Sequence, residues 1–108
     1  GYRPAMVRLL VLYGHPKDPA AFDRYYAENH IPLARKMKGL EKWTIGKVQP
    51  NADGSPSPYY YVADLYLKSR EDFDRLLASP EGLASVADVP NYATGGVTFL
   101  YTDIQEVI

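Results

Sequence analysis

The 108-residue chain has the length of one ordinary domain, taken here as residues 1–108, and a globular composition with formal net charge −1. It contains no basic run and no long apolar run, so neither nucleic-acid binding nor a membrane span is expected. With no cysteine it offers no disulfide, thiolate nucleophile or zinc–thiolate site. No signal peptide is visible, which favours a cytoplasmic location. Ten tyrosines against three phenylalanines is an unusual ratio. A tyrosine has an apolar ring and a hydroxyl that needs a partner, so it suits pockets and interfaces.

Four segments have the composition of β-strands, and they comprise residues 6–13, 40–48, 59–67 and 97–102. The tail to residue 108 could continue the last one. The first segment is apolar on both faces, and so is the third apart from Asp64, unlike a strand with one wet face. Residues 50–58 are rich in Pro, Gly, Asn and Asp, which predicts a solvated hairpin loop.

Two segments have helical features. The first helix is expected to begin with Asp18 as N-cap and Pro19 at its first position, and to end at Gly39. Its predicted core stripe is Phe22, Tyr26, Asn29, Leu33 and Met37.

The second helix follows Ser69, the N-cap of a weak capping box. Its buried residues are expected to be Phe73, Leu76 and Leu77. Ser79 then caps a short extra turn through Val86, and residues 89–96 are expected to be irregular.

A proline interrupts the first helix two residues after a histidine. Inside a helix, Pro32 removes one amide donor and its ring crowds the carbonyl four residues back, that of Glu28. The residue before a proline is also biased out of the helical region. The sequence therefore predicts a break or kink around residues 29–31, with His30 beside carbonyls that lack partners.

The order βαββαβ is that of the ferredoxin-like split βαβ arrangement, in which a four-stranded antiparallel sheet has both helices on one face. The opposite face of this sheet is still apolar, and an exposed patch of that size is rare on a monomer. We therefore predict a homodimer in which two sheets pack face to face, so that the α+β domain forms a dimeric α/β barrel.

Residues 25–34 (Tyr-Tyr-Ala-Glu-Asn-His-Ile-Pro-Leu-Ala), followed by Gly39-Leu40 and Trp43, resemble the EthD family. These small proteins belong to the dimeric α/β barrel superfamily and are named for a gene cluster that degrades ethyl tert-butyl ether. The resemblance implies the fold, the dimer and a pocket beside the first helix, and the family's histidine corresponds to His30. Members are often labelled oxidoreductases, and wider relatives include cofactor-free monooxygenases, cyclases, decarboxylases and dehydratases acting on aromatic or polyketide-like substrates.

His30 is the foremost candidate for catalysis, because a small pKa shift makes an imidazole a base or an acid at neutral pH. The alternative is that it caps the broken helix. Tyr26 precedes it by one turn, so its phenol could donate a hydrogen bond to a developing oxyanion. Packing against the sheet is the alternative for Tyr26.

Other candidates lie on the strands and in the first loop. Tyr13 and His15 flank the end of the first strand, where a pocket could open, although a solvated position is favoured for His15 in its Gly-His-Pro loop. Asp64 is either a substrate-binding residue or half of an ion pair with Arg8 or a tyrosine in the dimer core. An aromatic pocket could be lined by Trp43, Tyr66, Phe99 and Tyr101.

No spacing indicates a metal site, and Gly95-Gly96 lacks the strand–glycine–helix context of a dinucleotide site. Some barrel relatives bind haem through one histidine, but this sequence gives no positive sign of it. We therefore expect no bound cofactor and a small apolar or aromatic molecule as partner. The leading hypothesis is a catabolic or secondary-metabolic enzyme, either an oxidoreductase of the monooxygenase type or a proton-transfer catalyst. The alternatives are a non-catalytic binding or accessory protein for a monooxygenase system and a purely structural dimer module.

Overall fold

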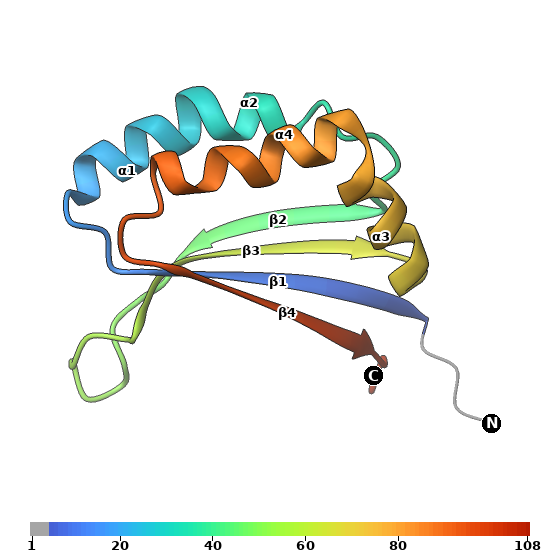
Figure 1. Cartoon of the computed structure of the whole chain (residues 1–108). Coiled ribbons are helices and arrows are strands. Elements are labelled where there is room, and N and C mark those ends of the chain that lie inside the picture. Colours follow the sequence, from blue (N-terminus) through green and yellow to red (C-terminus); the bar gives the residue numbers. More distant parts are fainter. Residues whose placement is uncertain (1–4) are drawn as a thin grey trace.

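The computed structural model describes residues 5–108 and contains a four-stranded antiparallel sheet covered by helices on one face (Figure 1). The strands are β1 (Met6–Gly14), β2 (Lys42–Lys47), β3 (Tyr59–Leu67) and β4 (Val97–Ile104), arranged in the order β2-β3-β1-β4. The predicted ferredoxin-like α+β fold is confirmed. Among residues 5–108, no helix has the length and apolar character needed to cross a bilayer.

The central strand β1 determines which side chains reach the helices. Leu9 lies between Leu65 of β3 and Tyr101 of β4, and this register turns one face of all three strands toward the helices. On that face every second residue of β1 is buried, from Val7 to Tyr13. The opposite face of β1 is half-buried, so both faces of the strand are partly sheltered, as its sequence predicts.

Asp18 caps α1 (Pro19–Tyr25) by accepting a hydrogen bond from the amide of Ala21, as predicted. The prediction of a break or kink around residues 29–31 is right that the helix departs from α-helical geometry there, but the helix does not break. The chain instead widens into the π-helical turn η1 (Tyr26–His30), in which the amide of Ile31 bonds the carbonyl of Tyr26, and it continues as α2 (Ile31–Ala34). Widening the turn just before Pro32 accommodates the proline ring without ending the helix.

The widened turn also changes which residues of this helix are buried. The buried positions are Phe22, Tyr26, His30 and Ala34, whereas Asn29 is exposed. A π-helical turn contains more than the usual 3.6 residues, so steps of four residues stay on one face. The predicted stripe was wrong in the middle for this reason, and the structure places His30 on the core side.

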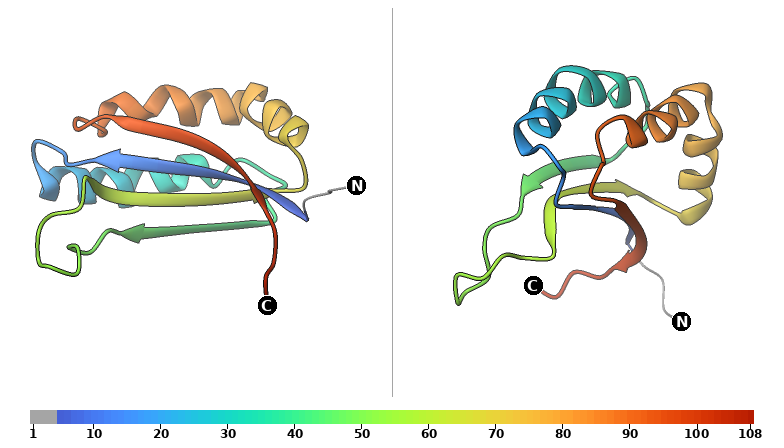
Figure 2. Two further views of the ribbon diagram at one scale, coloured as in Figure 1. Left: turned by 90° about the horizontal axis from the view of Figure 1, so that it is seen from below. Right: turned by 60° about the vertical axis from the view of Figure 1, so that its left-hand side comes forward.

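The second helical region is longer than the sequence predicts. Its helices are α3 (Arg70–Ala78) and α4 (Pro80–Asp88), followed by the short 3-10 helix η2 (Val89–Asn91). Ser79 joins α3 to α4, since its hydroxyl accepts from the amide of Gly82 and donates to the carbonyl of Leu76. α4 continues to Asp88 rather than Val86. It runs alongside the first helix above the sheet (Figures 1 and 2).

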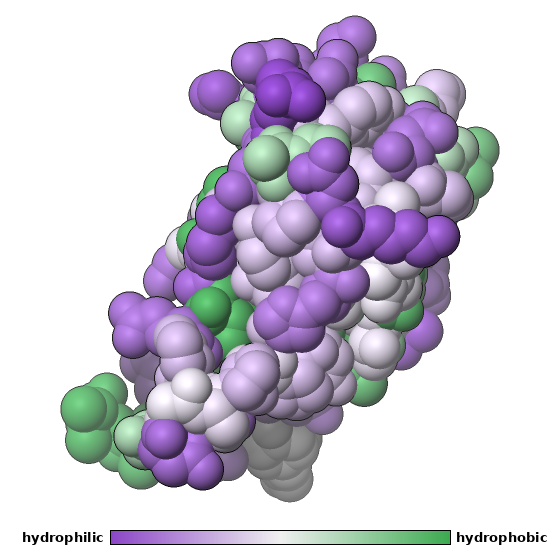
Figure 3. Space-filling view, turned by 90° about the vertical axis from the view of Figure 1, so that its left-hand side faces the viewer, coloured by the Kyte–Doolittle hydropathy of each residue, from purple (hydrophilic) through white to green (hydrophobic). Residues whose placement is uncertain are grey.

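The two layers meet in a core rich in aromatic side chains, where Phe22 and Phe73 are fully buried. The end of the molecule with the β2–β3 loop and the start of α1 is largely covered by hydrophilic side chains (Figure 3).

Candidate functional site

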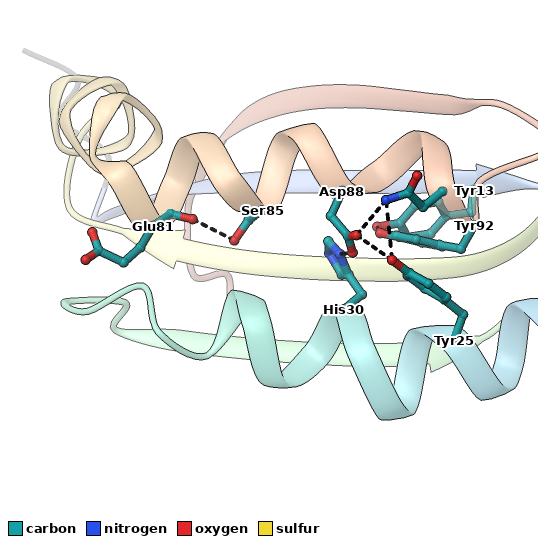
Figure 4. A network of polar contacts seen from close by, with 8 residues as sticks. Tyr13, Tyr25, His30, Glu81, Ser85, Asp88 and Tyr92 are labelled. Atoms are coloured by element: carbon teal, nitrogen blue, oxygen red, sulfur yellow. Dashed lines mark hydrogen bonds and ion pairs between the residues drawn. The ribbon is translucent and has the colours of Figure 1, made fainter.

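The central contact of the site joins the two helices above the sheet. Nδ1 of His30, in the π-helical turn, lies 2.9 Å from Oδ2 of Asp88, the last residue of α4 (Figure 4). His30 is 7% exposed and Asp88 9%. This contact replaces the predicted alternative for His30, because the imidazole bonds a carboxylate on another helix and does not cap a broken one.

Two further side chains hold the carboxylate. The hydroxyl of Tyr25 donates to Oδ1 of Asp88 at 2.6 Å, and the amide of Asn91 donates to the same oxygen at 3.0 Å (Figure 4). Burial by itself raises the pKa of Asp88, but the hydrogen bonds from Tyr25, Asn91 and His30 outweigh it and hold the pKa below its ordinary value. Asp88 is therefore ionised at neutral pH and fixes the imidazole in place.

The protonation state of His30 follows from this arrangement. Burial lowers the pKa of the imidazole, and the hydrogen bond and charge of Asp88 oppose this only in part. At neutral pH the ring is uncharged, and an ionised carboxylate at Nδ1 requires the proton on that nitrogen. Nε2 then carries the free lone pair, which is the form required of a general base.

Tyrosine rings surround the imidazole. Tyr26 stacks on His30 with ring centroids 5.5 Å apart, and Tyr92 lies 4.6 Å away. The hydroxyls of Tyr13 and Tyr92 are 2.5 Å apart and buried. Burial raises the pKa of Tyr13, Tyr26 and Tyr92, so these phenols stay protonated and can act as hydrogen-bond donors.

A cavity of about 60 Å³ lies between the helices and the sheet, with His30 in its wall. The other residues that line it are mostly apolar: Leu9, Val11, Tyr13, Tyr26, Ala34, Met37, Trp43, Ala63, Leu65, Leu77, Ser85, Val86, Val89 and Phe99. Its volume exceeds what one water molecule needs but is less than half of the roughly 150 Å³ cavity that holds benzene. Val86 and Phe99 in its wall are each 45% exposed, so it takes a group of a few heavy atoms, either a small molecule or the reactive end of a larger one. The site thus combines a neutral imidazole and phenol hydroxyls with an otherwise apolar chamber.

The structure brings together five of the residues predicted from the sequence, since His30, Tyr26, Tyr13, Trp43 and Phe99 all line this cavity. Phe99 is 45% exposed and lies on β4, an edge strand of the sheet.

Asp64 and Tyr66 lie elsewhere, because they face the side of the sheet away from the helices. Asp64 forms the predicted ion pair with Arg8, at 3.6 Å. Lys42 lies over the ring of Tyr66. His15 bonds the carbonyl of Ser57 at an exposed position in the loop.

Sequence reasoning missed the residues that hold or flank the imidazole and its carboxylate, which are Tyr25, Asp88, Asn91 and Tyr92. The last three fall where the sequence predicted irregular chain or the end of a helix. The available signal was the periodicity of α4, since Ser85 and Asp88 are buried on one face at a spacing of three. Among residues 5–108, no group of three or more His, Asp or Glu side chains gathers to hold a metal ion.

The EthD domain model matches residues 15–96, which include the first helix, the hairpin, α4 and Tyr92. The chain belongs to the EthD family. A protein of Rhodococcus erythropolis, known as an uncharacterized 11.0 kDa protein of the thcB–thcC intergenic region, is 42% identical over 95% of this chain and 99% of its own length. The crystal structure of an EthD family protein from Bacillus halodurans is 30% identical and superimposes with a TM-score of 0.86, covering 93% of this chain and 99% of that one.

Two more distant structures share the fold of this EthD protein. Hydroxynitrile lyase from Passiflora edulis is 19% identical, with a TM-score of 0.74 over 97% of this chain and 98% of that one. The cofactor-independent oxygenase SnoaB from Streptomyces nogalater is 16% identical, with a TM-score of 0.69 over 96% and 97% of the two chains. At these identities the likeness concerns the fold alone.

Proposed function

We propose that this EthD protein is an enzyme in which His30 acts as a general base on a small apolar or aromatic substrate. The observation that carries the proposal is the buried His30–Asp88 pair, whose imidazole lies in the wall of an apolar cavity. A carboxylate that holds Nδ1–H leaves Nε2 free to accept a proton, and a base positioned in this way contributes about 10²–10⁴ in rate.

The chemistry requires no bound cofactor. Nε2 of His30 takes a proton from a carbon next to a carbonyl, or from a phenol, and the electron pair stays on the substrate as an enolate or phenolate. The hydroxyl of Tyr13 or Tyr26 then donates a hydrogen bond to the new oxyanion. Return of the proton from the imidazolium to carbon or oxygen completes a proton-transfer cycle without any net oxidation.

Two structural neighbours are compatible with such chemistry. A hydroxynitrile loses its hydroxyl proton when its carbon–carbon bond to cyanide breaks, and this step requires a base. A cofactor-independent oxygenase carries out its reaction without a bound redox group. The base-catalysed proton transfer is the step that we propose for this chain, and reaction of the resulting carbanion with O₂ is a second reaction open to it.

The test is hydrogen–deuterium exchange at the α-carbon of small ketones such as acetone in D₂O, followed by NMR. We expect exchange above the buffer rate, increasing with pH to a plateau once His30 is deprotonated. His30→Gln should lower the exchange rate by about 10²–10⁴, whereas His15→Gln, at the exposed histidine, should leave it unchanged. Equal rates for the wild type and folded His30→Gln, or no exchange above buffer by the wild type, would contradict the proposal.

We also propose that the protein is a homodimer joined through the sheet face away from the helices. Leu10 lies on this face between Asp64 and Leu100, and Leu100 is 45% exposed. A second copy would cover this apolar surface and the partly exposed Arg8–Asp64 pair.

The mass of the protein in solution tests the proposed homodimer. Light scattering should give twice the mass of one chain. Leu10→Glu should halve that mass, whereas Leu83→Glu, at an exposed position of α4, should not.

A further inference from the structure

One buried polar atom near the cavity has no partner. The indole Nε1 of Trp43 is buried and forms no hydrogen bond, and it is the one side-chain nitrogen or oxygen in this state among residues 5–108. Leaving a buried N–H donor without an acceptor costs free energy, and native proteins satisfy nearly all such groups. The exception therefore indicates a partner that the chain itself does not supply.

The position of Trp43 indicates where that partner comes from. The residue lies in β2 opposite Leu65, on the sheet face toward the helices, and its side chain lines the same cavity as His30. It also lines a groove with Ile31, Arg35 and Ile45, so the residue borders both hollows. The outer torsion of a tryptophan has a broad minimum, so a small turn of the ring can bring Nε1 to a molecule in the cavity.

We propose that the Trp43 N–H donates a hydrogen bond to an oxygen of the substrate. The substrate class is then a small, largely apolar molecule with a neutral acceptor oxygen, such as a ketone, in preference to a hydrocarbon of the same shape. The inference rests on the proposed function in one respect, namely that the cavity beside His30 is the substrate site. It adds a specificity-determining residue opposite the helices that carry the base.

The preference has a defined energetic origin. A hydrocarbon in the cavity leaves the indole donor unpaired, whereas a ketone replaces its hydrogen bond to water with one to the indole. The indole N–H is already buried without a partner, so giving it an acceptor makes binding of the ketone more favourable. We expect the ketone to bind about 10-fold more tightly than the hydrocarbon.

The probes are acetone and 2-methylpropene, which differ only in the replacement of the oxygen by a CH₂ group and have four heavy atoms each. Trp43 is the only tryptophan of the chain, so the indole region of a ¹H–¹⁵N spectrum contains a single signal. We expect acetone to move the indole proton downfield and to bind about 10-fold more tightly than 2-methylpropene, which should not move it downfield. Equal affinities, no binding of either probe, or an unchanged indole proton at saturation with acetone would overturn the inference.

Trp43→Phe keeps an aromatic ring and removes the donor, so the affinity ratio of the two probes should fall from about 10 to about 1. If this variant does not fold, 3-benzothienylalanine at position 43 keeps the size of the indole and replaces the N–H by sulfur. A ratio that stays near 10 in either variant would overturn the inference.

His30→Gln separates this inference from the proposed function. It should abolish ketone exchange and leave the probe preference intact. The two proposals can therefore fail separately. If His30→Gln kept full exchange activity while the Trp43 variants lost the probe preference, the role of His30 as the base would be refuted and the role of Trp43 as a donor would stand.

Discussion

His30 and Asp88 lie 58 residues apart in the chain, yet their side chains meet at 2.9 Å and join the first helix to α4 above the sheet. The pair is almost fully removed from solvent, so its ionisation is linked to folding. The same contact that prepares the imidazole as a base therefore makes the stability of the protein depend on pH.

The first prediction concerns this linkage. Burial holds the pKa of His30 below its ordinary value of 6.5, so the unfolded chain takes up a proton near that pH that the folded chain does not. The free energy of unfolding should therefore be fully developed above about pH 6.5 and decrease as the pH falls through the lower folded-state pKa. Urea unfolding at a series of pH values measures this. The decrease should be smaller in His30→Gln and unchanged in His15→Gln, and equal slopes in all three proteins would contradict the assignment.

The second prediction is that Tyr25 adjusts the base through Asp88. Its hydroxyl bonds the carboxylate at 2.6 Å and helps to lower the pKa of Asp88. Tyr25→Phe removes this bond and leaves more negative charge at the carboxylate, so the pKa of both Asp88 and His30 should rise. The loss of stability should be small, because the contact is partly exposed.

NMR titration of the two histidines measures this effect. Tyr59→Phe is the matched control, because the tyrosine hydroxyl there takes no part in the His30 network. An unchanged His30 pKa in Tyr25→Phe would show that the tyrosine only fills space.

Local signals in the sequence predicted most of the fold. Asp18 and Ser69 cap helices as their residue types and positions suggest, and the turn-rich residues 50–58 join two strands. These features depend on hydrogen bonds within a few residues, so they can be recognised without knowledge of the tertiary structure. The disturbance that Pro32 causes in the helix was also predicted from its residue type. The chain can accommodate a proline by a break or by a widened turn, and packing of the helix over the sheet favours the widened turn.

The site was predicted only in part, for the same physical reason. His30, Tyr26, Tyr13, Trp43 and Phe99 could be selected individually by residue type and by strand or helix face. Asp88 could not, because its role depends on a contact between two helices whose relative position no local pattern specifies.

The third prediction concerns Gly82, where α4 closely approaches the end of α3. A Cβ atom on Gly82 would collide with the backbone carbonyl of Leu76 in α3. Gly82→Ala should therefore force α3 and α4 apart and lower the stability by about 1–3 kcal/mol. Because α4 carries Asp88, the variant should also change the NMR signals of His30. Gly46→Ala is the control, since a Cβ there meets no atom within 4 Å, and chemical unfolding of the two variants compares them. Equal stabilities would contradict the close approach of the helices.

The last prediction tests the hydrogen bond between Tyr13, which lines the cavity, and Tyr92 behind it. The hydroxyls of Tyr13 and Tyr92 are buried and 2.5 Å apart, so each is the other's hydrogen-bond partner. Tyr13→Phe or Tyr92→Phe alone leaves one buried hydroxyl without this partner and should cost about 1–3 kcal/mol. The double variant removes both polar groups, so it should cost less than the sum of the single variants. Thermal or urea unfolding of the four proteins gives the coupling energy, and strictly additive costs would show that the pair is not a hydrogen bond. Tyr13→Phe combined with Tyr59→Phe supplies the additive reference. A measured coupling would establish that these two buried phenols bond each other, which fixes the hydroxyl of Tyr13 in the wall of the cavity beside His30.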